Sequence, residues 1–457
     1  MEVGGVVSGI RCALLLALCS SCAHPSPRVA SAPFAPILTT RAVTDAGYHA
    51  ETSIAVSPTR PATVVASYEM PATVARSEDA GAHWSTAPLP GVEEFQLSGD
   101  PSVLFDADGH VYALYIAFDR PDDYDTLARA AHRNGVFVNR SDDGGATWQR
   151  RATPVIYHRE ELGIPFEDKP MMAVDRSDEP SRRGNLYVAW TEFRQEESVI
   201  LFSRSTDGGA SFSAPVEVSD RAGSPKDSTG ANEGTDVAVA PDGAVYVVWS
   251  DSAGIRLDRS TDGGRTFGED QLVARATDII FGVPSVLRAN GFPSLEIDPR
   301  SGRAYVAWVD RRLGVATPFI VSSSDGGASW SEPLAVASPT AADSVNRFFA
   351  WLSVDPVTGT VALSYYRERD AGAIEYELAY STDDGRHFTQ RTWSNRPFAP
   401  LGVFLGDYTG VAAYDGVAYG AWTEIVPPDP SHTQARREIG PRSRIAVGRA
   451  QLTPPPR

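Results

Sequence analysis

The stretch STDGGASF, residues 205–212, decides the fold, because five close copies of it stand elsewhere in the chain. Every copy reads Ser, any residue, Asp, any residue, Gly, two further residues and an aromatic. The copies begin at Ser77, Ser141, Ser205, Ser260, Ser323 and Ser381 and recur every 55 to 64 residues. A pattern that returns at such regular distances indicates a fold built from equivalent units.

Each copy has the composition of a tight turn between two strands. Ser and Asp side chains can bond the backbone of their own turn, and Gly accepts the positive φ that other residues resist. The aromatic returns the chain to an apolar strand. We therefore expect a structural role for the aspartates of the six boxes, which are Asp79, Asp143, Asp207, Asp262, Asp325 and Asp383.

A second, longer repeat consists of β-hairpins. Each copy is an apolar strand, a turn of Pro, Asp or Gly, and a strand that ends in an aromatic, as in DVAVAPDGAVYVVW (236–249). We expect the closing aromatics to fill the core between neighbouring sheets. They are Tyr68, Tyr115, Trp190, Trp249, Trp308, Tyr365 and Trp422.

Seven hairpins and six boxes predict a ring that closes on itself. Each unit contains a hairpin, a third strand into the box and a fourth strand out of it. The last unit has a third strand at 443–452 but no fourth strand, and residues 35–40 (APILTT) resemble the fourth strand APVEVS at 214–219. The sequence thus predicts an all-β protein: a seven-bladed β-propeller of four-stranded antiparallel blades over 35–452, closed by its N-terminal strand, with a tail at 453–457.

Composition excludes several classes of function. The 457 residues carry a net charge of −17, and nucleic acid is an unsuitable partner because its phosphates attract basic surfaces. The three cysteines lie within the first 22 residues, so the body of the chain can hold neither a disulfide nor a Cys-based metal site. The sequence DADG (106–109) resembles a calcium loop but has Ala117 where a Glu ligand belongs, so we expect a hairpin turn there. We expect no metal, no cofactor and a monomer.

Residues 1–22 have the character of a targeting leader. Arg11 precedes the apolar run CALLLALC (12–19), which is too short to span a membrane as a helix but suits a signal-peptide core. Small residues precede Cys22, as in the lipobox of bacterial lipoproteins, where the Cys is lipidated; plain signal cleavage is the alternative. Residues 23–34 are expected to be a flexible tether. These features predict an extracytoplasmic protein that is lipid-anchored to the bacterial outer membrane or cell surface, or else secreted or periplasmic.

On these motifs the chain resembles the BNR/Asp-box repeat proteins of the sialidase-like superfamily. The strongest matches are SRSTDGGASFSAP (203–215) and SSSDGGASWSEP (322–333), and YVAWVDRR (305–312) resembles a secreted bacterial group often labelled exo-α-sialidase. The resemblance implies boxes on outer turns, away from the ligand face. Sialidases of this superfamily also have six blades and an Arg-Ile-Pro motif that joins two further arginines around a substrate carboxylate. This sequence has no Arg-Ile-Pro, and seven blades are expected.

Candidate site residues come from the segments that meet at the entrance of a propeller's central channel. Those before the first strands of the blades are Glu51, Asp100, Asp168, Lys169, Glu233, Arg347, Asp407 and Tyr408; those after the second strands include Glu192, Asp251, Asp310, Arg311 and Arg367. One interpretation is that these charges cap strand ends and pair around the rim. The other is a ligand-binding entrance with acids on one side and arginines on the other.

Glycoside hydrolysis would need a proton donor and a second group at the anomeric carbon. For this chemistry we take Asp168 or Glu192 as the donor and Tyr408, beside Asp407, as the nucleophile. The candidate ligand-binding residues are Glu51, Asp100, Asp251, Asp310, Arg311, Arg347 and Arg367, among which an arginine can grip a carboxylate or sulfate. The sequence leaves two hypotheses open: a glycan-directed protein, and a non-catalytic scaffold for protein partners at the envelope.

Overall fold

The computed structural model describes the chain from the first strand of the propeller onward. The described residues are Met1 and 38–453 without 46, 121–131, 160–163, 228–229, 278, 285, 287, 341–342, 370–371, 400–403 and 427–441. Residues 2–22 of the leader with Cys22, the tether at 23–34, residues 35–37 of the predicted propeller span and residues 454–457 of the tail are not among them. Within the described residues, no helix has the length and apolar character needed to cross a membrane.

Seven antiparallel sheets of four strands make up the fold, as the sequence predicts. The first three blades are β2 (Ser53–Val56), β3 (Val64–Tyr68), β4 (Thr73–Ser77) and β5 (Ser85–Pro88); β6 (Leu97–Phe105), β7 (Val111–Phe118), β8 (Asn134–Ser141) and β9 (Thr153–His158); and β10 (Phe166–Val174), β11 (Leu186–Phe193), β12 (Ser198–Ser205) and β13 (Val216–Glu217). A short 3-10 helix, η1 (Val92–Glu94), joins the first two.

The remaining blades repeat the same order of strands. They are β14 (Glu233–Val239), β15 (Val245–Asp251), β16 (Gly254–Ser260) and β17 (Gln271–Arg275); β20 (Ser294–Ile297), β21 (Ala304–Asp310), β22 (Thr317–Ser323) and β23 (Leu334–Ala335); β24 (Arg347–Val354), β25 (Val361–Glu368), β26 (Ile374–Ser381) and β27 (Thr389–Thr392); and β28 (Gly410–Tyr414), β29 (Val417–Ile425), β30 (Ser443–Gln451) and β1 (Leu38–Ala42). A small extra sheet of β18 (Ile280–Phe281) and β19 (Ala289–Asn290) lies in the segment between the fourth and fifth blades.

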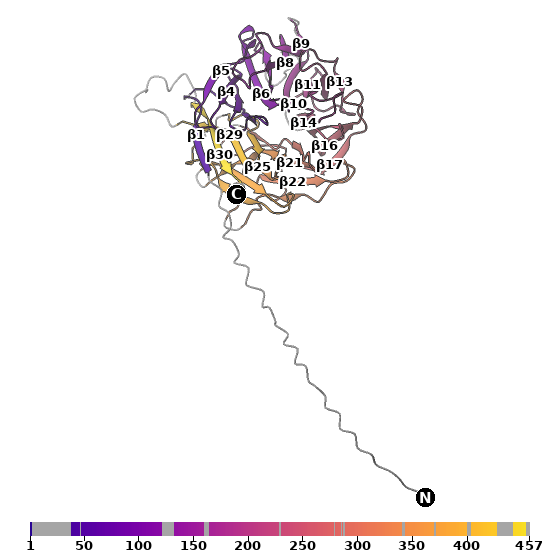
Figure 1. The fold of residues 1–457 in the computed structure, drawn as a ribbon, viewed down its shortest axis with the longest axis vertical. Helices are drawn as coiled ribbons and strands as arrows, with labels where there is room; N and C mark the ends of the chain where they lie inside the picture. The colour runs from indigo at the N-terminus through magenta and orange to yellow at the C-terminus, as the bar shows by residue number, and fades with distance from the viewer. Residues whose placement is uncertain are drawn as a thin grey trace. The chain divides into compact units, whose positions relative to one another are not determined.

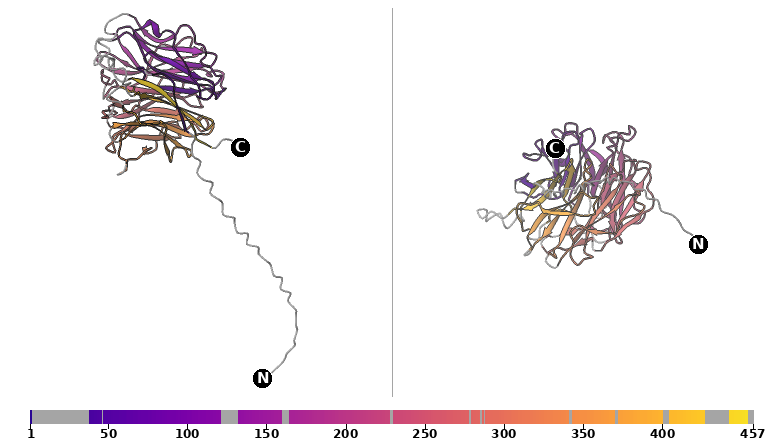
Figure 2. Two further views of the ribbon diagram at one scale, coloured as in Figure 1. Left: turned by 90° about the vertical axis from the view of Figure 1, so that its left-hand side faces the viewer. Right: turned by 60° about the horizontal axis from the view of Figure 1, so that its bottom comes forward.

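The ring closes through its first strand. β1 pairs with β30 in antiparallel register, from Leu38 opposite Ala450 to Ala42 opposite Ala446. The innermost strands contact one another in the order β2, β6, β10, β14, β20, β24 and β28, and β28 returns to β2. In Figure 1 the chain follows this ring by colour, and yellow β30 lies beside indigo β1. The two views in Figure 2 place the yellow strands between the purple and the orange blades.

Apolar residues from neighbouring sheets form the core between the blades. The seven closing aromatics of the hairpins are all buried, with relative exposures between 0% and 4%. Trp422, for example, stacks on Tyr376 of the preceding blade with ring centroids 4.5 Å apart. The expected role of these aromatics as filler between sheets is confirmed.

All six boxes fold into the same hydrogen-bonded turn. The Ser hydroxyl donates to its Asp Oδ1 at 2.7–2.9 Å and accepts the amide of the Gly at the fifth position of the box. The residue four positions after the Asp donates its own amide to Oδ1, and its side chain bonds Oδ2 at 2.5–2.7 Å. Each box carboxylate is therefore used within its own turn.

Arginines tie three boxes to the next box around the ring. The arginine that precedes the box Ser donates to the carbonyl of the first Gly of the following box. The pairs are Arg76 to Gly144 at 2.9 Å, Arg140 to Gly208 at 3.1 Å and Arg204 to Gly263 at 3.0 Å. The turns thus connect neighbouring blades as well as neighbouring strands.

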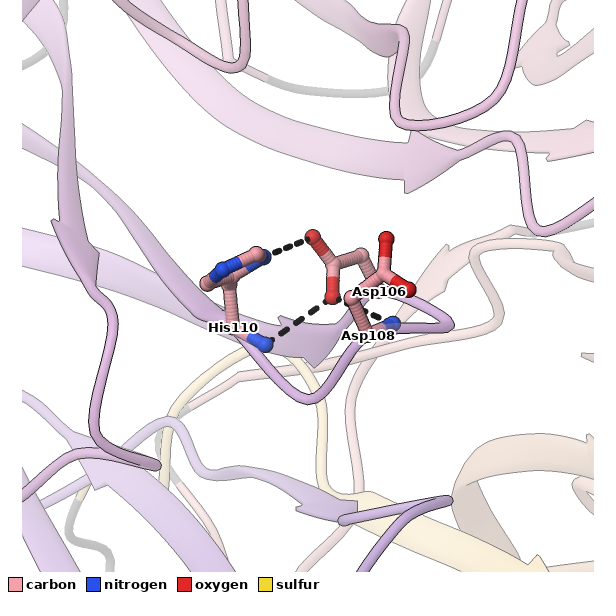
Figure 3. A group of neighbouring side chains, drawn as sticks. All are labelled: Asp106, Asp108 and His110. Carbon is pink, nitrogen blue, oxygen red and sulfur yellow. Dashed lines mark hydrogen bonds and ion pairs between the residues drawn. The ribbon is translucent and has the colours of Figure 1, made fainter. Parts of the chain in front are cut away.

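The acidic turn between β6 and β7 is held by hydrogen bonds and ion pairs of its own carboxylates. Asp106 Oδ1 accepts the amides of Asp108 and His110 at 2.9 Å each, and Oδ2 lies 2.7 Å from His110 Nδ1 (Figure 3). The carboxylate of Asp108 pairs with Arg183 at 2.7 Å. The segment forms the hairpin turn that the sequence predicts.

Candidate functional site

The same backbone bend recurs near the beginning of most innermost strands, at the entrance of the channel. At the start of five of the seven innermost strands, the aligned residue has a positive φ; these are Glu51 (47°), Asp100 (49°), Lys169 (48°), Gly234 (69°) and Phe349 (53°). In four of these blades the pairing with the second strand also shifts register at this position. Such bulges redirect side chains locally, and here they lie where charged residues gather.

Lys169 lies at the centre of a cluster of carboxylates. Its side chain is 4% exposed, and its Nζ lies 2.7 Å from Asp168 Oδ2 and 2.8 Å from Glu233 Oε1. The carboxylates of Asp407 and Asp227 lie 3.4 Å and 3.8 Å away from the same nitrogen. Burial alone would lower the pKa of Lys169, but these four acids raise it well above its usual value, so the ammonium stays charged.

Arg288 binds the same acids from the segment between the fourth and fifth blades. Its Nε donates to Asp407 Oδ1 at 3.0 Å, its Nη1 donates to Asp227 Oδ2 at 2.7 Å, and its Nη2 also contacts Asp407. Asn290, in β19, adds a bond to Asp407 Oδ1 at 2.9 Å. The small β18–β19 sheet therefore positions a guanidinium over two acids.

Three further acids form a second group. Asp100 donates its amide to Glu51 Oε2 at 3.2 Å, and Tyr408 donates its hydroxyl to Asp100 Oδ1 at 3.4 Å. Glu69 follows the closing aromatic of the first blade and is 6% exposed. Glycine makes room for these carboxyls, because a Cβ at Gly99 would lie 2.7 Å from Glu69 Oε2 and one at Gly406 would lie 2.6 Å from Glu51 Cγ.

Both groups line one cavity of about 740 Å³. Its wall includes Glu51, Glu69, Asp100, Asp168, Asp227 and Asp407 together with Lys169, Lys226 and Arg288. Phe118, Phe166 and Phe404 add aromatic surface. The volume lies within the range of small-ligand pockets, and charged residues outnumber the apolar ones on this wall.

The acids do not all lose a proton equally easily, and burial raises the pKa of Glu233, beside Lys169, well above its usual value. Burial, and then the charges of Glu69 and Asp407, raise the pKa of Glu51; burial and the charge of Glu51 raise that of Asp100. Burial and the neighbouring Asp100 raise the pKa of Glu69 to about 8. Burial opposes the ionisation of Asp227, but Lys169 and Arg288 overcome it and hold its pKa well below the usual value. One cavity thus holds protonated and ionised carboxyls at neutral pH.

The structure brings seven of the predicted site residues together, among them Lys169 and Glu233 of the cluster described above. Glu51, Asp100, Asp168 and Asp407 line the cavity, and Tyr408 is buried behind Asp100. Tyr408 is not among the described residues of the cavity wall, and burial followed by the charge of Asp100 raises its pKa well above the usual value.

The other predicted residues lie in ion pairs or on the surface. Glu192 pairs with Arg194 at 2.6 Å, and Asp251 pairs with Arg256 at 2.8 Å. Asp310 accepts a hydrogen bond from Trp308 Nε1 at 3.0 Å and forms an ion pair with Arg312. Arg347 and Arg367 both form ion pairs with Asp343. Arg311 is exposed. These contacts fit the interpretation that the charges pair around the rim, and a ligand-binding role for them stays a prediction.

Sequence reasoning missed Glu69, Asp227 and Arg288. Glu69 stands directly after Tyr68, one position earlier than the acids that follow the closing Trp residues. Asp227 and Arg288 belong to segments between blades that have no counterpart in the repeat. The sequence signal that could have found Asp227 and Arg288 was their position, because each lies in a segment that precedes an innermost strand.

No family model matches this chain. Likewise, no curated protein sequence matches it. The resemblance to BNR/Asp-box proteins therefore depends on the motifs of the sequence.

Among solved structures, the chain is similar to a protein of unknown function from Dyadobacter fermentans, with 14% identity, a TM-score of 0.49, and coverage of 91% of this chain and 99% of the other. It is similar to a leech intramolecular trans-sialidase at 13% identity and TM-score 0.48, covering 77% and 69% of the two chains. A PL25 polysaccharide lyase, an ulvan lyase, gives 13% identity and TM-score 0.49, with 83% and 92% covered.

Proposed function

We propose that the protein is glycan-directed and that its cavity cleaves a glycosidic bond by acid catalysis. The observation that supports this is that the acids of one cavity have pKa values shifted in opposite directions. Burial raises the pKa values of Glu51 and Asp100 well above the usual range, while Lys169 and Arg288 hold the pKa of Asp227 below it. Carboxyls whose pKa values are pushed apart are the arrangement that glycoside hydrolysis requires.

In this proposal the Glu51–Asp100 pair donates the proton to the leaving oxygen. The bond between this oxygen and the anomeric carbon breaks, and Asp227 stabilises the positive charge that develops at the carbon. A water molecule then adds to the carbon and returns a proton to the Glu51–Asp100 pair. Asp168 and Asp407, which contact Lys169 and Arg288, hold these two cations against the wall. Phe118, Phe166 and Phe404 offer flat apolar faces to a sugar ring.

A sialidase-like grip on a substrate carboxylate has little support in the geometry. Among the described residues, Arg288 is the arginine that lines the cavity, and it already binds Asp407 and Asp227. Arg347 and Arg367 are held by Asp343 in the sixth blade. We therefore place the proposed activity outside the exo-α-sialidase reaction.

The test is a hydrolysis assay on a panel of neutral, amino and acidic glycans, read by release of reducing ends. Asp100→Asn and Asp227→Asn should each lower the rate at least about 100-fold. Asn tolerates the positive φ at position 100, so the fold should survive the substitution. Arg150→Ala, at an exposed position outside the cavity wall, is the matched control and should retain full activity.

A panel on which the wild-type protein releases nothing would reject the proposed activity. The non-catalytic scaffold for a partner at the bacterial envelope would then be the better account of the same entrance.

A further inference from the structure

Most of the apolar side chains that line the cavity come from the first two blades. Met70 belongs to the β3–β4 turn of the first blade, and Leu97, Ile116 and Phe118 belong to β6 and β7 of the second. Leu97 lies directly opposite Phe118 in the register of these strands, so both side chains stand on one face of the sheet. Met70, Leu97 and Ile116, bordered by Phe118, make up the apolar part of the wall.

Met70 is the most exposed of these side chains. It is 47% exposed although it is large and apolar, and its φ of 68° is a value that glycine and asparagine accept more readily. Hydrogen bonds hold the turn on both sides, because the Glu69 amide donates to Ala50 O at 3.0 Å and the Ala72 amide donates to Ser98 Oγ at 2.9 Å. A bulky side chain that a strained backbone holds open in a cavity indicates a contact with a ligand.

The apolar part of the wall belongs to the same blades as the proposed proton donor. Glu51 precedes β2 of the first blade, and Asp100 lies in β6 of the second, the strand that also carries Leu97. Asp227 comes from the segment before β14, in the fourth blade. Because a proton donor lies next to the leaving oxygen, the leaving group should face the first two blades while the sugar faces Asp227.

We propose that the cavity takes glycosides whose leaving group is an apolar alcohol, aryl or alkyl, and that Met70 and Leu97 bind that group. This inference rests on the proposed hydrolysis and adds the class of leaving group to it. Both side chains are accessible within the cavity, and covering them with an aryl ring or alkyl chain removes apolar surface from water. A second sugar in this place, whose hydroxyls need hydrogen-bond partners, is the disfavoured leaving group.

The reaction then yields a free sugar and a phenol or alcohol. The bond between the anomeric carbon and the leaving oxygen breaks, and the oxygen keeps the bonding electrons and takes the proton of the Glu51–Asp100 pair. Water gives its hydroxyl to the anomeric carbon and its proton back to that pair.

The experiment compares phenyl and methyl 1-thioglycosides of the same sugar, in which sulfur replaces the leaving oxygen and slows cleavage. The sugars are glucose, galactose, mannose, N-acetylglucosamine and glucuronic acid in both anomers, and phenol is a third probe. Calorimetric titration of the full chain at pH 7 gives the affinities. For the sugar that binds, we expect the phenyl thioglycoside to bind at least about tenfold more tightly than the methyl thioglycoside and than phenol alone.

Two variants test the residues that make the preference. Met70→Asn removes the apolar side chain and suits the positive φ, so the melting temperature should not fall. Leu97→Thr removes apolar surface and keeps a residue that favours strands. Each should reduce the preference for phenyl over methyl to less than about threefold. Leu313→Asn, which changes a similarly exposed leucine outside the cavity wall, is the matched control and should leave the preference unchanged.

Several results would overturn the inference. These are equal binding of the phenyl and methyl compounds for every sugar, an undiminished preference in both variants, phenol that binds as tightly as the phenyl thioglycoside, or no binding of any probe. Cleavage of the matching O-glycosides separates the inference from the proposed activity. Equal KM values for phenyl and methyl O-glycosides that are both cleaved would reject the apolar leaving group and leave the hydrolase standing. A phenyl preference that depends on Met70, without cleavage of any O-glycoside, would reject the hydrolase and leave the binding of an apolar group standing.

Discussion

At the scale of single residues, the positive charge of Lys169 compensates the acids that surround it. Lys169 is a buried cation whose nitrogen lies within 2.8 Å of two carboxylates from two blades, Asp168 and Glu233. Its own positive φ, in a bulge of β10, directs it among them. A lysine in this position compensates acids that would otherwise be buried without a partner.

Lys169→Met should therefore destabilise the protein strongly. Leaving buried charges without their partner costs about 3–5 kcal/mol. We expect a loss of that size in the free energy of unfolding at pH 7, measured by denaturant titration. The loss should shrink at pH 5, where the acids can take up protons. Lys226→Met, at an exposed position on the cavity rim, serves as the control; an equal loss there would contradict the central role of Lys169.

At the scale of secondary-structure elements, β1 holds the ring shut. Five residues of β1 pair with β30, and Thr40 also donates its hydroxyl to Trp393 O of the sixth blade at 2.6 Å. Without β1, the backbone N–H and C=O groups of β30 that now pair with β1 would form an exposed sheet edge, which favours aggregation.

A chain that begins at Val43 should melt at least about 5 °C lower than one that begins at Ala35. The difference has a simple cause, since only the first of the two variants lacks β1. Differential scanning calorimetry measures it, and a synthetic peptide of residues 35–42 should restore part of the loss. Identical melting curves for the two truncated chains would show that β1 contributes nothing to closure.

At the scale of the whole molecule, two sets of acids respond to pH in opposite directions. Asp325 and Asp383 have pKa values lowered to about 2, chiefly by the hydrogen bonds of Ser329 and His387. Their contribution to stability is lost as the pH falls from about 4 toward 2. Burial raises the pKa of Glu69 to about 8 and that of Asp236 to about 7. The folded chain keeps these protons while the unfolded chain loses them, so stability falls as the pH rises from about 4 toward 8.

The melting temperature should accordingly be highest at mildly acidic pH. A calorimetric series from about pH 3 to pH 9 would show this maximum, and Glu69→Gln should flatten the decline on its alkaline side. A melting temperature that rises steadily up to pH 8 would speak against the raised pKa values of the buried acids.

The fold was readable from the sequence because its signals are local. A box needs its Ser, Asp and Gly within five residues, and the similarity between residues 35–40 and 214–219 predicted that the first strand completes the last blade. The seven predicted residues that the structure brings together were readable for the same reason, since each stands at or next to the beginning of an innermost strand.

The arrangement of the site was not readable, because its contacts join distant segments. The four acids around Lys169 come from three stretches of the chain, and Arg288 comes from a segment without a counterpart in the repeat. Nor does local sequence distinguish Asp310, which is held by Trp308 and Arg312, from Asp168, which faces a cavity. Only the assembled ring decides which acids meet.

Pairing the earliest strand with the latest has a consequence for biosynthesis. Residues 38–42 are translated first, but their partner at 446–450 is nearly the last part of the chain to be made. The nascent propeller must therefore remain open until synthesis is almost complete, with both unpaired edges exposed to other chains. Contacts this distant in sequence form slowly, so the open intermediate is the stage at which a folding chaperone would have most effect.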